Sequence, residues 1–262
     1  MNAASAGAIA AGIAIPAGLA LLSRLFPAPA PTTVYFNALK TTYRKWTTVM
    51  AVVMLAVTVP LSLLFWTILN ALAHWRASLL PPAEVTFAPI VPVYWGFPAL
   101  LLALTASGFV AMRVVQWRLG ERYDEFLNYW AASSKMDPVK ANTVVAGICA
   151  TLSILIISLG LRPYVQLRDG HLAVQGYFSL TEARYPIAAV QTIKTSAHFI
   201  APNGNLVSRR EYIVGFTGGG RWTTAWIPSD PNEAAKRAFV ETLSRRSGVA
   251  IEQVDHFGKG EL

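Results

Sequence analysis

Residues 47–75 read TTVMAVVMLAVTVPLSLLFWTILNALAHW and contain no charged side chain. A helix rises about 1.5 Å per residue, so about 20 apolar residues cross a hydrocarbon core roughly 30 Å thick. The stretch therefore predicts a membrane-spanning helix. Two further uncharged stretches, 90–112 and 143–161, predict two more spans. We expect residues 1–162 to form a multi-pass α-helical membrane region.

The N-terminal stretch 3–26 is apolar but rich in alanine and glycine, and Pro16 interrupts it. A signal peptide would carry basic residues before its apolar run, whereas the first basic residue here, Arg24, follows the run. We expect a fourth span at 3–26. A cleaved or interfacial segment is the alternative.

Lysine and arginine in the short loops predict the orientation, because cytoplasmic loops are enriched in both. Segments 24–46 and 113–142 hold nine of them, against Arg76 alone in the loop 76–89. The nine are Arg24, Lys40, Arg44, Lys45, Arg113, Arg118, Arg122, Lys135 and Lys140. Both segments should be cytoplasmic, and residues 163–262 extracytoplasmic. If 143–161 were re-entrant, the C-terminal part would be cytoplasmic instead.

The net charge differs between the two parts of the chain, and aromatic residues mark the edges of the spans. Residues 1–162 have a net charge of +6 and residues 163–262 of +2, which together make the +8 of the chain. An excess of +2 is too small to indicate a nucleic-acid partner. Aromatic residues mark both edges of the spans, as interfacial belts do: Tyr43, Trp46 and Trp117 on one side, and Trp75, Tyr94 and Trp95 on the other.

The cytoplasmic loop 113–142 contains an amphipathic pattern. Apolar and aromatic residues recur on one helical face, at Tyr123, Phe126, Leu127, Trp130 and Ala131. This face predicts either an interfacial or partner-binding helix, or the polar end of the second span. Asp137-Pro138 then resembles a helix cap followed by proline in the first turn, so the third span should begin early.

After residue 162 the pattern changes to the alternation typical of strands. We expect short strands at 163–168, 171–178, 181–186, 188–199, 210–217 and 221–227. Asp169-Gly170 and Gly218-Gly219-Gly220 predict hairpin turns, because glycine tolerates a positive φ. A helix should follow, with Asp230 as cap, Pro231 in the first turn and Gly248 as the stop. Its buried stripe should be Ala235, Phe239, Val240 and Leu243.

Strands closed by one amphipathic C-terminal helix resemble the bacterial pleckstrin-homology-like (PH-like) domains found beside membrane spans. The resemblance rests on four features: the hairpin at Arg168-Asp169-Gly170, the segment 185–193 (YPIAAVQTI), the strand pair 210–226, and the helix end 243–249 (LSRRSGV). It covers residues 163–250 and leaves 251–262 as a tail. It implies an α+β, mainly-β half barrel in a protein of the bacterial inner membrane. Such domains serve as scaffolds for lipids, peptides or other proteins.

Basic residues of this domain offer one candidate surface. Arg209, Arg210, Arg221, Arg237, Arg245 and Arg246 could form a patch that attracts anionic headgroups. A solvated face balanced by Glu211, Glu233 and Glu241 is the alternative. In phospholipid-binding members of the family the first hairpin loop is rich in lysine and arginine. Here Arg168 is followed by Asp169, which argues against phosphoinositide binding.

Signals for catalysis are missing from the sequence. The histidines, His74, His171, His198 and His256, are scattered, and the one cysteine, Cys149, lies inside an apolar run. The glycine-rich stretch 215–220 lacks the Lys-Ser/Thr of a phosphate loop. We expect a non-enzymatic protein without metal or cofactor, whose C-terminal domain serves binding or assembly at the membrane surface, with a protein partner or a second copy. An accessory subunit of a membrane enzyme or transporter is the alternative.

Overall fold

The computed structural model describes residues 33–88, 92–201, 203–226 and 233–258, with the backbone alone for residues 33–38 and for Trp226. The expected span at 3–26, with Arg24, and the expected cap at Asp230 therefore lie outside the described residues. The chain divides into two compact units, residues 1–68 with 96–155, and residues 69–95 with 156–262. The division differs from the expected single boundary at residue 162, because residues 69–95 belong with the C-terminal part.

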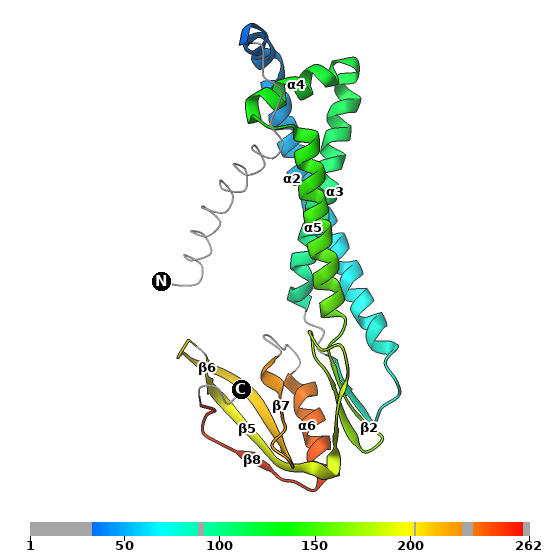
Figure 1. Cartoon of the computed structure of the whole chain (residues 1–262), viewed down its shortest axis with the longest axis vertical. Coiled ribbons are helices and arrows are strands. Elements are labelled where there is room, and N and C mark those ends of the chain that lie inside the picture. Colours follow the sequence, from blue (N-terminus) through cyan, green and yellow to red (C-terminus); the bar gives the residue numbers. More distant parts are fainter. Residues whose placement is uncertain (1–32, 89–91, 202, 227–232, 259–262) are drawn as a thin grey trace. The chain divides into compact units, whose positions relative to one another are not determined.

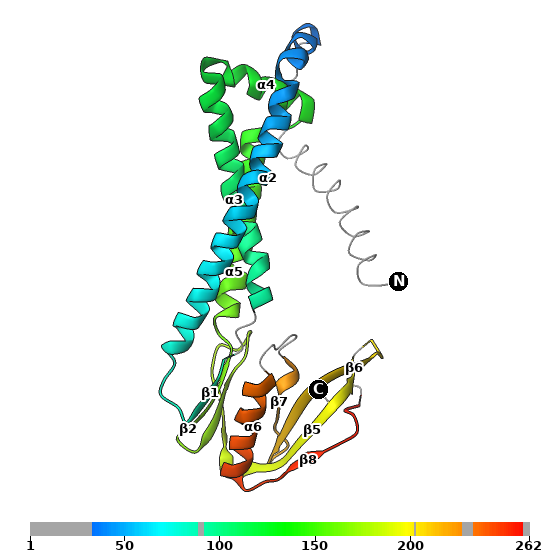
Figure 2. The ribbon, with the colours of Figure 1, turned by 180° about the vertical axis from the view of Figure 1, so that it is seen from behind.

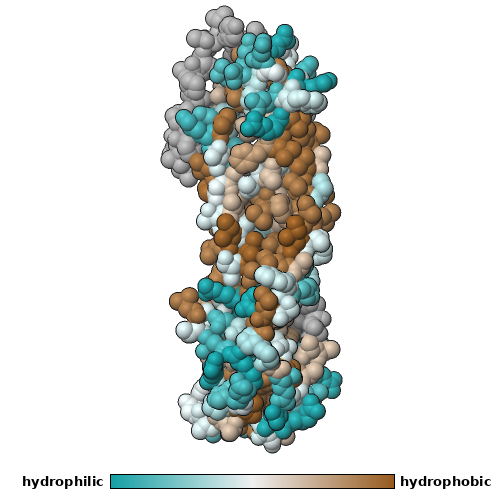
Figure 3. All heavy atoms as spheres, turned by 90° about the vertical axis from the view of Figure 1, so that its right-hand side faces the viewer, coloured by the Kyte–Doolittle hydropathy of each residue, from teal (hydrophilic) through white to brown (hydrophobic). Residues whose placement is uncertain are grey.

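Three described helices are long and apolar enough to cross a membrane, as the sequence predicts. They are α2 (Thr33–Ser78), α3 (Pro92–Leu119) and α5 (Pro138–Gly160). Many of their large apolar side chains face outward, including Leu55, Val59 and Leu63, which are 69%, 62% and 61% exposed. In Figure 3 hydrophobic residues gather over the helices of the first unit. Such an apolar exterior suits a hydrocarbon environment better than water.

The helix α5 begins where the sequence predicts. The Asp137 carboxylate accepts hydrogen bonds from the backbone N–H groups of Val139 and Lys140, both at 3.1 Å. Two of the helix's unpaired donors are satisfied in this way, and Pro138 has no N–H to satisfy. The cap confirms the early start of this helix.

The amphipathic loop folds as η1 (Gly120–Arg122) and α4 (Tyr123–Ser134). Phe126 and Tyr129 of α4 are buried against Tyr43 of α2, with ring centroids 6.2 and 6.3 Å away. The Tyr43 hydroxyl also donates to Glu125 at 2.6 Å. The apolar face of α4 is thus covered by the chain itself, and the start of α2 lies beside α4 (Figure 1).

The described residues of the second unit form two four-stranded sheets. In the first, the order is β1 (Val85–Phe87), β2 (Tyr164–Arg168), β3 (His171–Gln175) and β4 (Ala183–Pro186), all antiparallel. Asp169 and Gly170 join β2 to β3 with φ of 52° and 72°. Both values are positive, as a two-residue type I′ hairpin turn requires. The predicted hairpin is confirmed.

The second sheet follows the corner η2 (Ile187–Ala189) and has the order β7 (Arg221–Thr223), β6 (Leu206–Phe216), β5 (Val190–Ile200), β8 (Ile251–Gln253). The expected turn at Gly218-Gly219 joins β6 to β7, with φ of 90° and 82°. The strand β8 runs parallel to β5, and Phe257 beyond it is 2% exposed. The structure thus differs from the expected tail at 251–262, part of which completes this sheet.

The helix α6 (Glu233–Ser247) closes the core between the two sheets (Figure 2). Its Phe239 ring lies 6.3 Å from Phe87 of β1 and 6.0 Å from Trp222 of β7. One buried ring therefore contacts an edge strand of each sheet. The helix ends at Gly248, whose φ is 71° and whose N–H donates to Ser244, as the sequence predicts.

The strand β1 lies in the segment 76–89, which the sequence predicts to be a loop. It pairs with β2 in the register Val85↔Leu167 to Phe87↔Val165. The fully buried Gln166 holds the segment further, because its Nε2 donates to the carbonyl of Pro81 and to Thr86 Oγ1 at 2.9 and 3.1 Å. The loop between two candidate spans thus supplies the first strand of the C-terminal domain.

Candidate functional site

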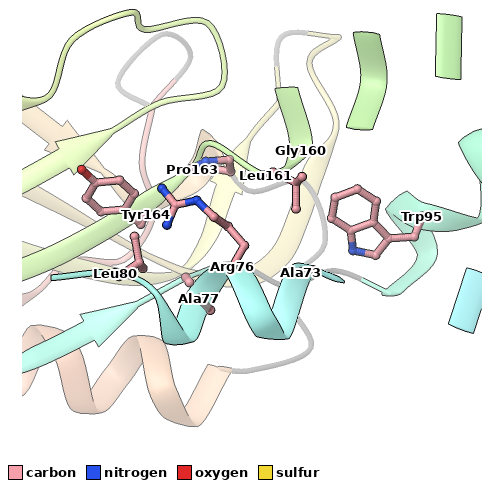
Figure 4. A pocket seen from close by; sticks show the side chains of 10 residues that line it. Ala73, Arg76, Ala77, Leu80, Trp95, Gly160, Leu161, Pro163 and Tyr164 are labelled. Carbon is pink, nitrogen blue, oxygen red and sulfur yellow. The ribbon is translucent and has the colours of Figure 1, made fainter. Parts of the chain in front are cut away.

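The second unit has a small cavity where helix ends meet the first sheet. Its volume is about 20 Å³, enough for one water-sized group. The lining residues are Ala73, Arg76, Ala77, Leu80, Ala88, Trp95, Gly160, Leu161, Pro163 and Tyr164. They come from the end of α2, the residue after β1, the start of α3 and the α5–β2 junction (Figure 4). All the segments that connect the candidate spans to the C-terminal domain therefore border the cavity.

Two polar groups border this cavity. Trp95 is 2% exposed, and its indole N–H has no hydrogen-bond acceptor among the described residues. Arg76 turns its guanidinium toward Tyr164 and Pro163, on the other side from Trp95 (Figure 4). A buried N–H and a nearby cation favour an oxygen atom as occupant, from water or from an anionic group.

A tight packing contact forms one wall of the cavity. Gly160, in the last turn of α5, lies so close to α3 that an added Cβ would stand 2.3 Å from Tyr94 Cε1 and 2.8 Å from Trp95. The Tyr94 hydroxyl donates to the carbonyl of Ile156 at 2.8 Å. Glycine at this position allows both rings to pack directly on the α5 backbone.

Behind the cavity, one carboxylate joins β2 to the β3–β4 loop. Glu182 accepts from Tyr164 at 2.6 Å, from Arg168 at 2.7 Å and from Arg184 at 2.6 Å. Burial alone would raise the pKa of Glu182, but these three hydrogen bonds outweigh it and lower the pKa. Burial and the bond to Glu182 raise the pKa of Tyr164, so its hydroxyl stays a donor at neutral pH.

The β3–β4 loop itself reaches the helix ends. Tyr177 lies against Tyr94, with ring centroids 6.2 Å apart. The next apolar residues of the loop, Phe178 and Leu180, are 83% and 85% exposed. The sequence marks Tyr94 and Trp95 as span-edge aromatics, but it gives no sign that a loop far along the chain lies beside them.

The six arginines of the predicted patch lie on β6, β7 and α6 and are largely paired. The ion pairs are Arg209–Glu211 at 2.5 Å, Arg210–Glu233 at 3.9 Å, Arg237–Glu241 at 2.7 Å and Arg246–Glu84 at 2.8 Å. Arg245 donates to Thr242 on the same helix, and Arg221 is in β7. This pairing favours the alternative of a balanced, solvated face over a cationic patch.

One of these partners belongs to a buried cluster that the sequence did not reveal. Glu211 is fully buried and accepts from Thr224 at 2.5 Å, and its carboxylate lies 3.5 Å from the ammonium of Lys236, which is 2% exposed. Lys236 also donates to the carbonyl of Arg210 at 2.8 Å. The cluster ties α6 to β6. The Lys236 and Glu211 side chains are only 3% and 1% exposed, which makes a structural role more fitting than catalysis.

In the first unit, eight of the nine orientation residues are described, and all belong to segments that meet near α4. Lys40, Arg44 and Lys45 are in the first part of α2, Arg113 and Arg118 in the last part of α3, and Arg122, Lys135 and Lys140 in η1, after α4 and in the first turn of α5. A cavity of about 300 Å³ opens nearby. Its lining includes Met50, Met54, Met112 and Met136, flexible side chains suited to an adaptable apolar partner.

Within the described residues, no group of three or more histidine, cysteine, aspartate or glutamate side chains could hold a metal ion. Comparisons with protein families, with characterised proteins and with solved structures give no match. The function must therefore be inferred from this geometry alone.

Proposed function

We propose that the chain is a non-enzymatic, multi-pass protein of the bacterial inner membrane whose PH-like domain serves binding or assembly at the membrane surface. The pairing of β1 with β2 is the observation that carries the proposal. Because β1 precedes α3 and β2 follows α5, two separate segments fasten the domain to the candidate spans. A domain connected to the spans by two segments stays at the membrane surface in one orientation.

The PH-like assignment is supported by the order of the elements. Two four-stranded sheets, antiparallel except for the β5–β8 pair, turn into each other at η2, and one C-terminal helix closes the opposite corner between β1 and β7. This order is compatible with the half barrel that the resemblance implies. Two differences from that expectation are the insertion of α3, α4 and α5 between β1 and β2, and the additional parallel strand β8.

The same pairing supports the extracytoplasmic placement of the domain. Backbone hydrogen bonds between β1 and β2 require the loop 76–89 and residues 163–262 to lie on one side of the bilayer. A re-entrant 143–161 segment would put them on opposite sides, so the sheet favours a crossing segment at 143–161. The loop holds one basic residue against nine in the two segments expected in the cytoplasm, which favours the outer side.

A reporter fused after Leu262 tests this placement. An alkaline phosphatase fusion, active only outside the cytoplasm, should be active, and a fluorescent fusion that matures only in the cytoplasm should be dark. The same two reporters placed within residues 133–135, in the segment expected to be cytoplasmic, should give the opposite result. A fluorescent C-terminal fusion would overturn the placement.

The alternative function, an accessory subunit of a membrane enzyme or transporter, is favoured by the methionine-lined cavity of the first unit. A photo-crosslinking amino acid distinguishes the two. Placed at Arg184, whose side chain is 64% exposed in the edge strand β4, it should capture a specific protein or a second copy if the domain mediates assembly. Placed at Met112, it should do so only if the cavity holds a partner helix.

Size measurement completes the test of assembly. In mild detergent the protein component should exceed the 28.4 kDa of one chain, by light scattering with the detergent subtracted. Recovery of a lone chain, with no adduct at Arg184, would refute an assembly role for the domain.

A further inference from the structure

We propose that the β3–β4 loop, residues 176–182, inserts Phe178 and Leu180 into the bilayer interface on the side of the C-terminal domain. The inference rests on the proposed membrane function and adds a second mode of contact to it. The occupant is the phospholipid bilayer itself, at the boundary between headgroups and acyl chains.

The position of the loop follows from the sheet register. Tyr164 pairs with Gln175, and Val174 pairs with Ala183. The loop between β3 and β4 therefore leaves the sheet at the end where α5 enters β2. The Asp169-Gly170 turn lies at the opposite end of the same strands.

Contacts with the helix ends fix the depth of the loop. Tyr177 packs on Tyr94 in the first turn of α3, and Tyr94 bonds to the carbonyl of Ile156 in α5. Ile156 lies four residues before the end of α5 at Gly160, or about 6 Å along the axis at about 1.5 Å per residue. The loop thus lies level with the last turn of a candidate span.

The loop is also held in shape, so its apolar residues remain outside the core. Gln175 Nε2 donates to the carbonyl of Ser179 at 2.5 Å across the loop. At its far end, Glu182 is bonded to Tyr164 and Arg168 of β2. With both ends anchored, Phe178 and Leu180 project outward rather than packing on the sheet.

The distribution of exposed apolar residues points to lipid rather than a soluble partner. In the second unit, the large apolar side chains exposed among the described residues are Trp75, Leu79, Val93, Phe178, Leu180 and Leu206. All except Leu206 belong to helix ends or to this loop. Residues 176–181 (GYFSLT) carry no charge. Uncharged aromatic and aliphatic residues beside span ends are typical of a membrane-interface anchor.

Site-specific fluorescence on the full chain tests the proposal. In a Cys149→Ser background, single cysteines at Phe178 and Leu180 would carry an environment-sensitive dye, in vesicles of phosphatidylcholine and phosphatidylglycerol. A lipid with a spin label at the top of its acyl chain serves as the quencher, because that position matches the interfacial depth of about 5–10 Å. We expect blue-shifted emission and strong quenching at both positions.

Two matched positions keep the outcomes separate. Ala188→Cys, exposed at the turn end of the sheet, should stay unquenched. The dye on Leu63→Cys in α2 should be quenched by a lipid spin label deep in the acyl chain if the helices span the bilayer. If the dye at Leu63 is quenched but the dyes at Phe178 and Leu180 are quenched no more than the dye at Ala188, the loop insertion alone is overturned. Absence of quenching at Leu63 would overturn the membrane function. Blue-shifted but unquenched dye at Phe178 would indicate a protein partner and would also overturn the insertion.

Discussion

At the scale of single residues, Gly160 illustrates how a missing side chain can define an interface. The space that a methyl group would need is occupied by rigid rings of Tyr94 and Trp95. The neighbouring cavity is too small to receive either ring. Overpacked sites of this kind typically cost about 1–3 kcal/mol, because the rings must leave their preferred positions.

The substitution Gly160→Ala should therefore lower the thermal unfolding midpoint of the detergent-solubilised protein, followed by tryptophan fluorescence. Gly147→Ala is the matched control in the same helix, since an added Cβ there meets nothing within 4 Å. It should be neutral or stabilising by up to about 1 kcal/mol, because alanine is the better helix former. Equal behaviour of the two variants would contradict the close contact.

Glu182 predicts a defined pH dependence. Its pKa is lowered in the folded protein, so its hydrogen bonds contribute stability above the ordinary glutamate pKa of about 4.3. That contribution is lost as the pH falls through the folded-state pKa. Glu182→Gln should flatten the acid limb of a stability–pH curve measured by urea unfolding. The exposed Glu252→Gln in β8 should leave the curve unchanged.

At the scale of elements, the Glu211–Lys236 pair determines how α6 is attached to β6. Removing one partner of a buried ion pair leaves the other charge uncompensated, which typically costs about 3–5 kcal/mol. Glu211→Ala should reduce the free energy of unfolding by that order, measured by urea unfolding in detergent. Glu241→Ala removes an exposed pair on the same helix, with Arg237, and should change the free energy of unfolding little, because solvent screens the pair. A similar loss in both variants would refute the structural role of the buried pair.

Local signals explain which elements could be predicted from sequence. The Asp169-Gly170 turn and the Asp137 cap depend on neighbouring residues alone, so the sequence determines them. The strand β1 has three residues, too few to show an alternating pattern. Its partner strand β2 lies far along the chain: Gln166 of β2 bonds to Pro81, which is 85 residues earlier. Lys236 was missed for a related reason, because its partner Glu211 lies on another element.

At the scale of the whole molecule, β1 should be essential for the C-terminal domain. Residues 163–262 alone lack Phe87, so the Phe239 ring would lose its contact on one side. We expect this fragment to be poorly soluble or to unfold without cooperativity. Joining residues 81–88 before residue 163 through a flexible linker should restore a cooperative thermal transition, followed by circular dichroism. Phe87→Ser in the joined fragment should abolish the recovery.

The interrupted order of that domain also has a consequence for biosynthesis. A ribosome makes β1 early, then α3, α4 and α5, and only later the strands that β1 needs. Between these events β1 has no partner strand, and it gains one only after three helices have been synthesised and positioned. Under the proposed topology, a chain whose helices insert wrongly would leave β1 and β2 on opposite sides of the membrane. Under that topology the sheet can be completed only after correct membrane insertion, so a chain that inserts wrongly would keep an incomplete domain core.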